Sequence, residues 1–343
     1  MAERRIWEEL SVYESHDFVG KWYKIRHGRT LNAVRTREIA SSFTQGREYF
    51  ASAKGAATSV RPLLFYYGVL SLSRGLILLL DRTKTEATLK PSHGLEVVDW
   101  QGTLAQGLDK VLELKVRATN GTFAELARAT GNMQATAWWI APDMNIGYYS
   151  ANFASPNFLA DGSILTLDDI ASRDHRFLAL YSLTTGRRTK VHLSEIVSDP
   201  NGVQVSVLPM QGGSKLIVEN NFGWPTGVIV RDRGAARRLP IPNFYVTLPG
   251  TEPSILKTKL PVSQYTQNDG MFLLEDLPNG DRMSELLRTF LLSYYLGMLV
   301  RYFPSRWIAL LRNEKGDVAQ PLLIAAVNAV EADFPELVVA NLS

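Results

Sequence analysis

Two arginines in long apolar stretches are the residues whose chemistry stands out first. Arg74 lies within Pro62–Leu80, and Arg301 lies within Leu286–Leu311. A guanidinium inside an apolar helix must be paired or open to a cavity, because an isolated buried charge is costly. One interpretation is a set of buried ion pairs that fix how the helices pack, and Glu48 is then the expected partner of Arg74.

The other interpretation of these arginines is an anion site. Planar guanidinium groups grip phosphate well, so Arg74, Arg301 and Arg306 together with His93 could bind one. His93 lies in the sequence Ser-His-Gly-Leu and is the best candidate for a general acid or base. The remaining histidines show no pairing typical of metal ligation: His16, His27, His175 and His192.

A second constellation imitates the Asp…Glu-x-Lys arrangement of metal-dependent nucleases. It consists of Asp99, Glu113 and Lys115. On a strand, Glu113 and Lys115 would point to the same face, which is the geometry that such a Mg²⁺ site needs. An amphipathic strand with a solvated face produces the same pattern, so both interpretations stay open.

Positive charge is concentrated near the N-terminus. Seven lysines and arginines between positions 21 and 47 face one carboxylate, Glu38, whereas the whole chain carries a net charge of +3. The seven are Lys21, Lys24, Arg26, Arg29, Arg35, Arg37 and Arg47. Such a segment is either a solvated arm or a contact for a phosphate backbone, with Trp22 and Tyr23 available for stacking.

A second basic cluster lies in the middle of the chain. It contains Arg231, Arg233, Arg237 and Arg238.

Several function classes lose support from what the sequence lacks. It has no cysteine, which removes disulfides, thiolate zinc sites and cysteine nucleophiles. It also lacks the P-loop, dinucleotide-binding, zincin and nucleophile-elbow motifs. The first ten residues have no apolar segment of the length that a secretory signal needs.

The elements that must position these residues are mainly helical at both ends. We expect a short helix over 6–13, an irregular basic segment, and helices over 39–59 and 62–80. Near the C-terminus we expect helices from 283 to 304 and over 322–334. The 62–80 stretch is almost long enough to cross a bilayer, but Arg74 and its serines and glycines favour a buried core helix.

The middle of the chain has a different character, because Pro and Gly are frequent and short β-type runs replace long helical ones. We expect strands over 111–117, 203–208, 227–231 and 244–248, and short helices over 123–129 and 167–171. The resulting division is a basic arm (1–40), a helical hairpin (41–96), a strand-containing module (97–280) and C-terminal helices (281–343).

Four phrases carry a family resemblance. They are FTQGREYFASAKGAATSVRPLLFYYGVLSLSRGLILL (43–79), SHGL (92–95), NGTFAEL (120–126) and FLLSYYLGMLVRYFPSRW (290–307). They resemble the YaaC-like proteins of bacteria over most of the chain and in the same order. The resemblance implies a cytoplasmic bacterial protein, and some relatives lie beside antiviral defence genes.

The helical parts are also loosely similar to HEPN-type bundles, many of which are ribonucleases with an Arg-x4-6-His motif. The spacing occurs here at Arg187 and His192. It falls after a glycine turn in the strand-rich middle rather than on a bundle helix, which counts against ribonuclease activity.

The predicted fold is α+β and mainly helical, with a HEPN-like bundle built from the two ends and a strand-containing insertion. The favoured function is a non-enzymatic subunit of a bacterial defence or nucleic-acid-handling complex. It binds a partner protein and DNA or RNA through its basic surfaces, without a membrane or a cofactor. The alternatives are a nuclease effector, with Mg²⁺ only for the metal-dependent form, and a sensor of a small nucleotide signal.

Overall fold

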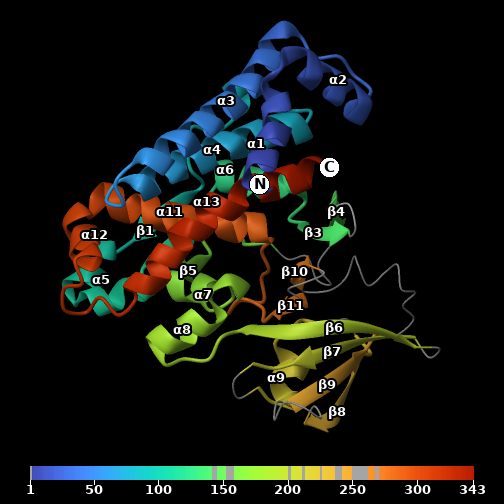
Figure 1. The fold of residues 1–343 in the computed structure, drawn as a ribbon, viewed down its shortest axis with the longest axis vertical. Helices are drawn as coiled ribbons and strands as arrows, with labels where there is room; N and C mark the ends of the chain where they lie inside the picture. The colour runs from blue at the N-terminus through green and yellow to red at the C-terminus, as the bar shows by residue number, and fades with distance from the viewer. Residues whose placement is uncertain are drawn as a thin grey trace. The chain divides into compact units, whose positions relative to one another are not determined.

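The computed structural model divides the chain into two compact units, which are described separately (Figure 1). Unit 1 comprises Met1–Asn132, Ala160–Leu167 and Leu286–Leu342, and unit 2 comprises Met133–Leu159 and Asp168–Glu285 with Ser343. The residues that the structure describes are 2–140, 145–151, 158–199, 202–210, 213–224, 226–235, 242–248, 262–266 and 270–343. Helices and antiparallel strands both occur, so the predicted mixed and mainly helical class is confirmed.

Unit 1 is mainly helical. Its α-helices are α1 (Ala2–Ser11), α2 (His16–His27), α3 (Ala33–Gly55), α4 (Arg61–Leu80), α5 (Trp100–Ala105), α6 (Thr122–Thr130), α11 (Glu285–Tyr302), α12 (Pro304–Leu311) and α13 (Gln320–Leu342). Its 3₁₀ turns are η1 (Val12–Glu14), η2 (Glu86–Thr88) and η3 (Leu108–Glu113). A small antiparallel sheet has the order β1 (Leu95–Val98), β2 (Lys115–Ala118) and β5 (Ile164–Thr166).

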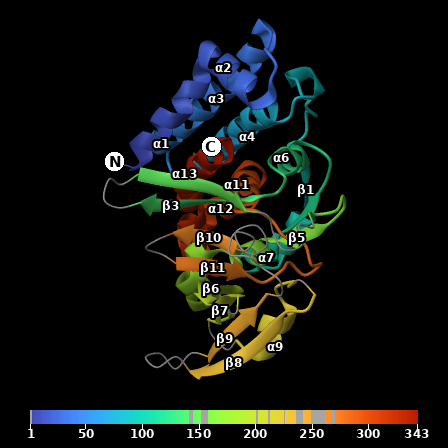
Figure 2. The ribbon, with the colours of Figure 1, turned by 90° about the vertical axis from the view of Figure 1, so that its right-hand side faces the viewer.

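Helices α3 and α4 form a hairpin whose axes approach closely because glycines line the contact. A Cβ on Gly68 would lie 2.5 Å from the Phe50 ring, and one on Gly75 would lie 2.8 Å from the Phe43 ring. Both phenylalanines are 1% exposed, so the missing side chains leave room for buried rings. Figures 1 and 2 show the two helices running side by side.

The C-terminal helices pack against this hairpin and complete the core of unit 1. Helix α13 contacts α1 and α4, and in α11 a Cβ on Gly297 would lie 2.7 Å from Cβ of Tyr66. Tyr295 on α11 donates a hydrogen bond of 2.7 Å to the carbonyl oxygen of Leu165 in β5. The prediction that helices from the two ends of the chain share one core is therefore confirmed.

Unit 2 is built on an antiparallel sheet with the strand order β10-β11-β6-β7-β9-β8 and a separate β3-β4 hairpin. The strands are β3 (Gln134–Ile140), β4 (Asn145–Ala151), β6 (Val191–Asp199), β7 (Gly202–Leu208), β8 (Ile229–Ala235), β9 (Pro242–Thr247), β10 (Val262–Thr266) and β11 (Gly270–Leu274). The helical elements are α7 (Leu167–Ala171), η4 (His175–Phe177), α8 (Leu178–Thr185) and α9 (Lys215–Asn220). Alternate residues of β7 and β9, including Val205, Val207 and Val246, are fully buried against Phe222.

Two sequence-based expectations for local structure are wrong. The segment expected to be irregular and basic contains α2, which begins where the Ser15 side chain accepts from the Phe18 N–H and ends at Gly28 with φ +65°. The strand expected over 111–117 begins only at Lys115, because the preceding residues form η3. Consecutive burial of Val111 and Leu112 breaks the period of two that a half-buried strand requires.

Helix α4 is long and apolar enough, by length and composition, to cross a membrane. In its most apolar window, 67% of the residues are buried inside the protein, as in the core helix that the sequence predicted.

Candidate functional site

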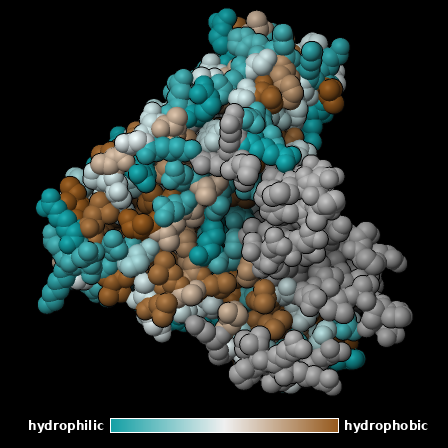
Figure 3. All heavy atoms as spheres, in the orientation of Figure 1, coloured by the Kyte–Doolittle hydropathy of each residue, from teal (hydrophilic) through white to brown (hydrophobic). Residues whose placement is uncertain are grey.

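Helix α2 presents a basic face to solvent. Its apolar residues Val19 and Tyr23 are buried one turn apart, which leaves the opposite side free for charged side chains. Five exposed cations lie on this helix, on the loop after it and in the first turns of α3, and we call them the α2 basic surface: Lys21, Lys24, Arg26, Arg29 and Arg37. Within the described part of the chain, none of the five forms an ion pair. Figure 3 shows this end of unit 1 as mostly hydrophilic.

The other two predicted cations of this segment have structural partners. Arg35 donates hydrogen bonds to the carbonyl oxygens of Lys84 at 2.6 Å and Arg82 at 3.3 Å. Arg47 forms a two-pronged ion pair with Glu14, at 2.6 and 3.0 Å. Both guanidinium groups hold the α3–α4 hairpin to neighbouring segments and are not free for a ligand.

A shallow hollow of about 430 Å³ lies beside the α2 basic surface. Its lining includes Lys21 and Lys24, one carboxylate, Asp17, and Thr30 and Leu31 from the loop after α2. Two cations at the edge of a recess suit a phosphate group better than a flat surface does, because the recess limits how far water screens them.

The loop that carries His93 is held by backbone contacts with the start of α6. The Phe123 N–H donates to the His93 carbonyl oxygen, and the Thr122 N–H donates to that of Ser92, both at 3.0 Å. Gly94 has φ +78°, and a Cβ on Gly121 would lie only 2.4 Å from the Gly94 nitrogen. Only glycine fits at Gly121, so the phrases SHGL and NGTFAEL meet and fix the position of His93.

The side chain of His93 bonds to Tyr66, and this bond determines which ring nitrogen carries the proton. Tyr66 is fully buried, and its burial strongly raises the pKa of its hydroxyl, which therefore stays protonated. The hydroxyl lies at His93 Nδ1, and we assign Tyr66 as the donor and Nδ1 as the acceptor because the hydroxyl keeps its proton. His93 Nδ1 therefore accepts, and the neutral ring carries its hydrogen on Nε2.

Burial and the nearby positive charge of Arg301 lower the pKa of His93. At neutral pH the ring is uncharged and offers Nε2–H as a donor, rather than a free lone pair that could act as a general base. We call the group that surrounds it the His93 cluster, defined as Tyr66, Tyr67, His93, Tyr294, Arg301 and Tyr302. The rings of Tyr66, His93 and Tyr294 lie 5.5–6.0 Å apart.

The side chain of Arg301 is exposed, so the expectation that its charge is enclosed by apolar helices is wrong. It occupies the last turn of α11, where the helix leaves the core. Its Nη1 donates to the Tyr67 hydroxyl at 3.3 Å, and its guanidinium carbon lies 5.1 Å from the centre of the Tyr302 ring. Arg306, also exposed, lies on the next helix.

Arg74 lies in a different environment from Arg301. It is partly buried and lines a groove of about 660 Å³ along α3 and α4, together with the carboxylates of Glu38, Glu48 and Glu86. Among the described residues Arg74 and Glu48 form no ion pair, so their predicted pairing is wrong. The surplus of carboxylates also disfavours binding of an anion in this groove. The predicted anion site, which combined Arg74 with Arg301, Arg306 and His93, is therefore not assembled around Arg74.

The predicted nuclease constellation has ordinary structural partners. Asp99 caps α5 by accepting from the Gly102 N–H at 3.1 Å, and Glu113 pairs with Lys110 at 2.9 Å. Glu113 ends a 3₁₀ turn while Lys115 begins β2, so the expected placement of both on one strand face is wrong. Among the residues described, no cluster of His, Asp and Glu has the composition of a metal site.

The second basic cluster is only partly described. Arg231 is exposed on β8, and Arg233 follows on the same strand. Arg237 and Arg238 lie outside the described residues.

Glu275 is the centre of a polar network in unit 2 that the sequence did not reveal. Its Oε1 accepts from Arg188 and from His192 Nε2 at 2.8 Å, and its Oε2 accepts from Arg188 at 3.0 Å and from Asn221 at 2.9 Å. Burial would raise the pKa of Glu275, but these hydrogen bonds outweigh it and lower the pKa to about 2. Four donors saturate both oxygens, which leaves none for a ligand.

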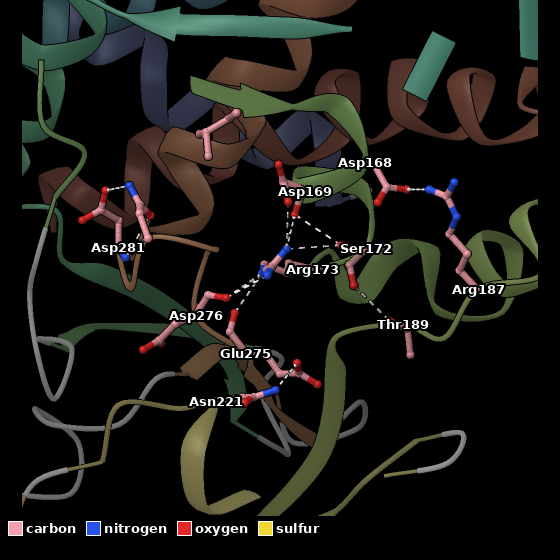
Figure 4. Close-up of polar contacts among 12 residues, drawn as sticks. Asp168, Asp169, Ser172, Arg173, Arg187, Thr189, Asn221, Glu275, Asp276 and Asp281 are labelled. Carbon is pink, nitrogen blue, oxygen red and sulfur yellow. Dashed lines mark hydrogen bonds and ion pairs between the residues drawn. The ribbon is translucent and has the colours of Figure 1, made fainter. Parts of the chain in front are cut away.

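Arg173 extends this network through the backbone. Figure 4 shows its guanidinium between Asp169 and the segment of Glu275 and Asp276, to whose carbonyl oxygens it donates at 2.7–3.1 Å. The Arg187 side chain pairs instead with Asp168 at 3.1 Å. Arg187 and His192, which have the ribonuclease-type spacing, therefore serve separate partners, and the network is structural.

The comparison with protein families agrees with the resemblance noted in the sequence. A family model described as YaaC-like Protein matches residues 11–342. The chain belongs to the YaaC-like family. Searches of curated proteins and of solved structures found no significant match.

The YaaC-like match covers residues from both units, including the α2 basic surface and the His93 cluster. In this YaaC-like chain, sequence reasoning found Arg301 and His93 but missed Tyr66, Tyr67, Tyr294 and Tyr302. The tyrosine pairs Tyr-Tyr at 66–67 and 294–295 were available as a signal. However, tyrosine pairs also occur in apolar helices that only form a core, so this signal does not by itself indicate a site.

Proposed function

We propose that this YaaC-like chain is a non-enzymatic, cytoplasmic subunit of a bacterial antiviral-defence or nucleic-acid-handling complex. It binds the phosphate backbone of a nucleic acid through the α2 basic surface and docks on a partner protein. The supporting observation is that five exposed cations have no carboxylate partner among the described residues. Neutralising phosphates with such cations releases counterions, which favours binding to any sequence.

The arrangement of the basic surface fits backbone contact better than base reading. Lysine acts as a point charge that tolerates many phosphate positions, whereas reading a base requires a fixed, two-pronged donor. Arg26 has its guanidinium 5.9 Å from the centre of the Trp22 ring, which leaves its charge exposed. Ile25, 87% exposed among these cations, is the apolar group that we assign to the contact with the partner protein.

The fold of unit 1 is proposed to be HEPN-like, with the bundle helices α3, α4, α11 and α13. The support is the shared core of helices from both ends of the chain. The association with defence rests on the family resemblance alone.

The test of nucleic-acid binding is fluorescence anisotropy with labelled duplex DNA and single-stranded RNA between about 50 and 200 mM salt. Five phosphate contacts predict a slope of log affinity against log salt of about −4 to −5 for duplex DNA. In the variant Lys21→Gln/Lys24→Gln/Arg26→Gln, the slope should become shallower by about 3.

The matched control removes the same charge elsewhere in unit 1, as Lys90→Gln/Arg312→Gln/Lys315→Gln, which are exposed positions. If both triple variants bind as the wild type does, or if both lose the same affinity, the α2 basic surface is not the binding site. Recovery of a partner from the native host should be lost with Ile25→Ser and retained with Val318→Ser, another exposed apolar position.

The nuclease alternatives are less well supported. A general base at His93 would need a free lone pair on Nε2, and the hydrogen bond from Tyr66 places the proton there. A Mg²⁺ site at Asp99, Glu113 and Lys115 would need Glu113 and Lys115 on one strand face. Cleavage of the labelled strands in the same assay, with or without Mg²⁺, would overturn the non-enzymatic assignment.

A further inference from the structure

The His93 cluster contains a cation that has no ion-pair partner among the residues that the structure describes. Arg301 is exposed and forms no ion pair within the described part of the chain. The partners of its guanidinium are the hydroxyl of Tyr67 and the ring of Tyr302, and both leave its full charge in place. Tyr67 is itself held by stacking on Tyr49, with ring centres 5.6 Å apart. Arg301 is thus oriented without being neutralised.

A neutral donor belongs to the same cluster. Because Tyr66 donates to Nδ1 of His93, the group that the partly exposed ring can offer to a ligand is Nε2–H. The contact between Gly94 and Gly121 fixes the backbone of this loop, so the donor is held in place before a ligand arrives. A fixed cation and a fixed neutral donor together suit an oxyanion better than a cation or an apolar ligand.

An exposed aromatic surface adjoins these donors. Tyr302 is 53% exposed, although it carries a large ring next to a buried core. Bases stack on tyrosine rings and on guanidinium planes, and both groups are present here, with the guanidinium over one face of the Tyr302 ring. A simple phosphate would leave the ring unused, whereas a nucleoside phosphate would use the ring and the charge together.

We propose that the His93 cluster binds a nucleoside monophosphate, with its phosphate on Arg301 and His93 Nε2–H and its base against Tyr302. This site is separate from the α2 basic surface and does not depend on it. No bond is made or broken in the proposed interaction.

The experiment is isothermal titration calorimetry of the full chain with AMP, GMP, CMP and UMP, each tested singly. Inorganic phosphate, ribose 5-phosphate and adenosine separate the contribution of the phosphate from that of the base. We expect at least one nucleotide to bind about tenfold or more tightly than any of these three fragments. Arg301→Gln should weaken that nucleotide at least about tenfold, as expected for loss of a charged hydrogen-bond donor.

Two further variants keep the test independent of folding. Tyr302→Leu should abolish the preference for the nucleotide over ribose 5-phosphate, because it should weaken the nucleotide far more than ribose 5-phosphate. The control Arg306→Gln removes an exposed arginine from the next helix and should bind as the wild type does. Circular dichroism should show all three variants folded, because each position is exposed.

Three results would overturn the proposal. The first is no binding of any nucleotide at millimolar concentration. The second is an equal loss in Arg301→Gln and Arg306→Gln. The third is loss of nucleotide binding in the triple variant of the α2 basic surface, which would place the nucleotide at that surface instead. Failure of strand binding with retained nucleotide binding would affect only the proposed function.

Discussion

The Glu275 network offers a test of the structure that is independent of function. Glu275→Gln keeps the volume of the side chain but removes its charge. It also replaces one acceptor oxygen by an N–H₂ group, which cannot accept from the donors that surround that position. Arg188 and His192 are then left partly unpaired in a site where the carboxylate is 4% exposed. Breaking one partner of a buried charged pair is strongly destabilising.

The expected magnitude follows from the pKa of Glu275. Hydrogen bonds outweigh burial and lower this pKa from 4.5 to about 2. At about 1.4 kcal/mol per pKa unit, the ionised form stabilises the folded protein by about 3 kcal/mol at pH 7. Because the folded-state pKa is the lower one, this stability is fully present above about pH 4.5. It falls to about 1 kcal/mol near pH 3 and is lost as the pH drops through about 2.

The assay is urea unfolding at pH 7, 4 and 3, followed by circular dichroism, for wild type and Glu275→Gln. The difference in free energy of unfolding should shrink as the pH falls. Glu219→Gln is the control, since its ion pair with Lys215 is exposed and should contribute less than about 1 kcal/mol. A difference for Glu275→Gln that stays constant from pH 7 to 3 would refute the assignment of its stabilising role to the ionised carboxylate.

Three further predictions concern unit 1. Gly121→Ala should lower the free energy of unfolding by about 1–3 kcal/mol or more, because its Cβ would collide with the backbone of the His93 loop. The control Gly55→Ala has open space around the new methyl group and should not destabilise the protein. Thermal unfolding measures both variants. Tyr295→Phe should cost about 1 kcal/mol in the same measurement, since it removes a hydrogen bond to a buried carbonyl oxygen of β5. In NMR titrations, burial and the charge of Arg301 should hold the pKa of His93 below 6.5, and Arg301→Gln should raise it; an unchanged value would show that the two side chains do not interact.

The sequence predicted the helices that have strong apolar patterns. The short helix over 167–171 coincides with α7, and the break before Pro304 separates α11 from α12 because proline is best tolerated in the first turn of a helix. Pro335 does not end the last helix, which continues to Leu342. Tertiary burial of Phe334 and Val338 outweighs the local cost of the proline.

Helices rich in charge were harder to predict. Helix α2 has only two buried apolar residues, Val19 and Tyr23, and six positions that are polar or charged, so its pattern resembles a solvated arm. The caps at Ser15 and Gly28 mark its ends, but its stability depends on packing against α3 and η1, which the local sequence does not show. The strand expected at 111–117 failed for a related reason, since β-type residues can also fill a buried 3₁₀ turn.

The candidate sites depend on contacts between distant segments, which spacing in the sequence does not show. The hydroxyl of Tyr66 meets His93 across 27 residues, and Glu275 meets His192 across 83. Arg74 and Arg301 look equivalent in the sequence because both interrupt apolar helices. One lies beside carboxylates in a groove, and the other emerges at a helix end.

The shared core of α4 and the C-terminal helices sets an order of events during synthesis. The described strands of unit 2 precede position 285, so that sheet can form while the ribosome is still translating α11 and α13. Helices α3 and α4 leave the ribosome much earlier, yet their covering partners α11 and α13 are made only after the described strands of unit 2. The apolar flank of α4 must therefore wait, exposed or shielded by a chaperone, until α11 and α13 have been made.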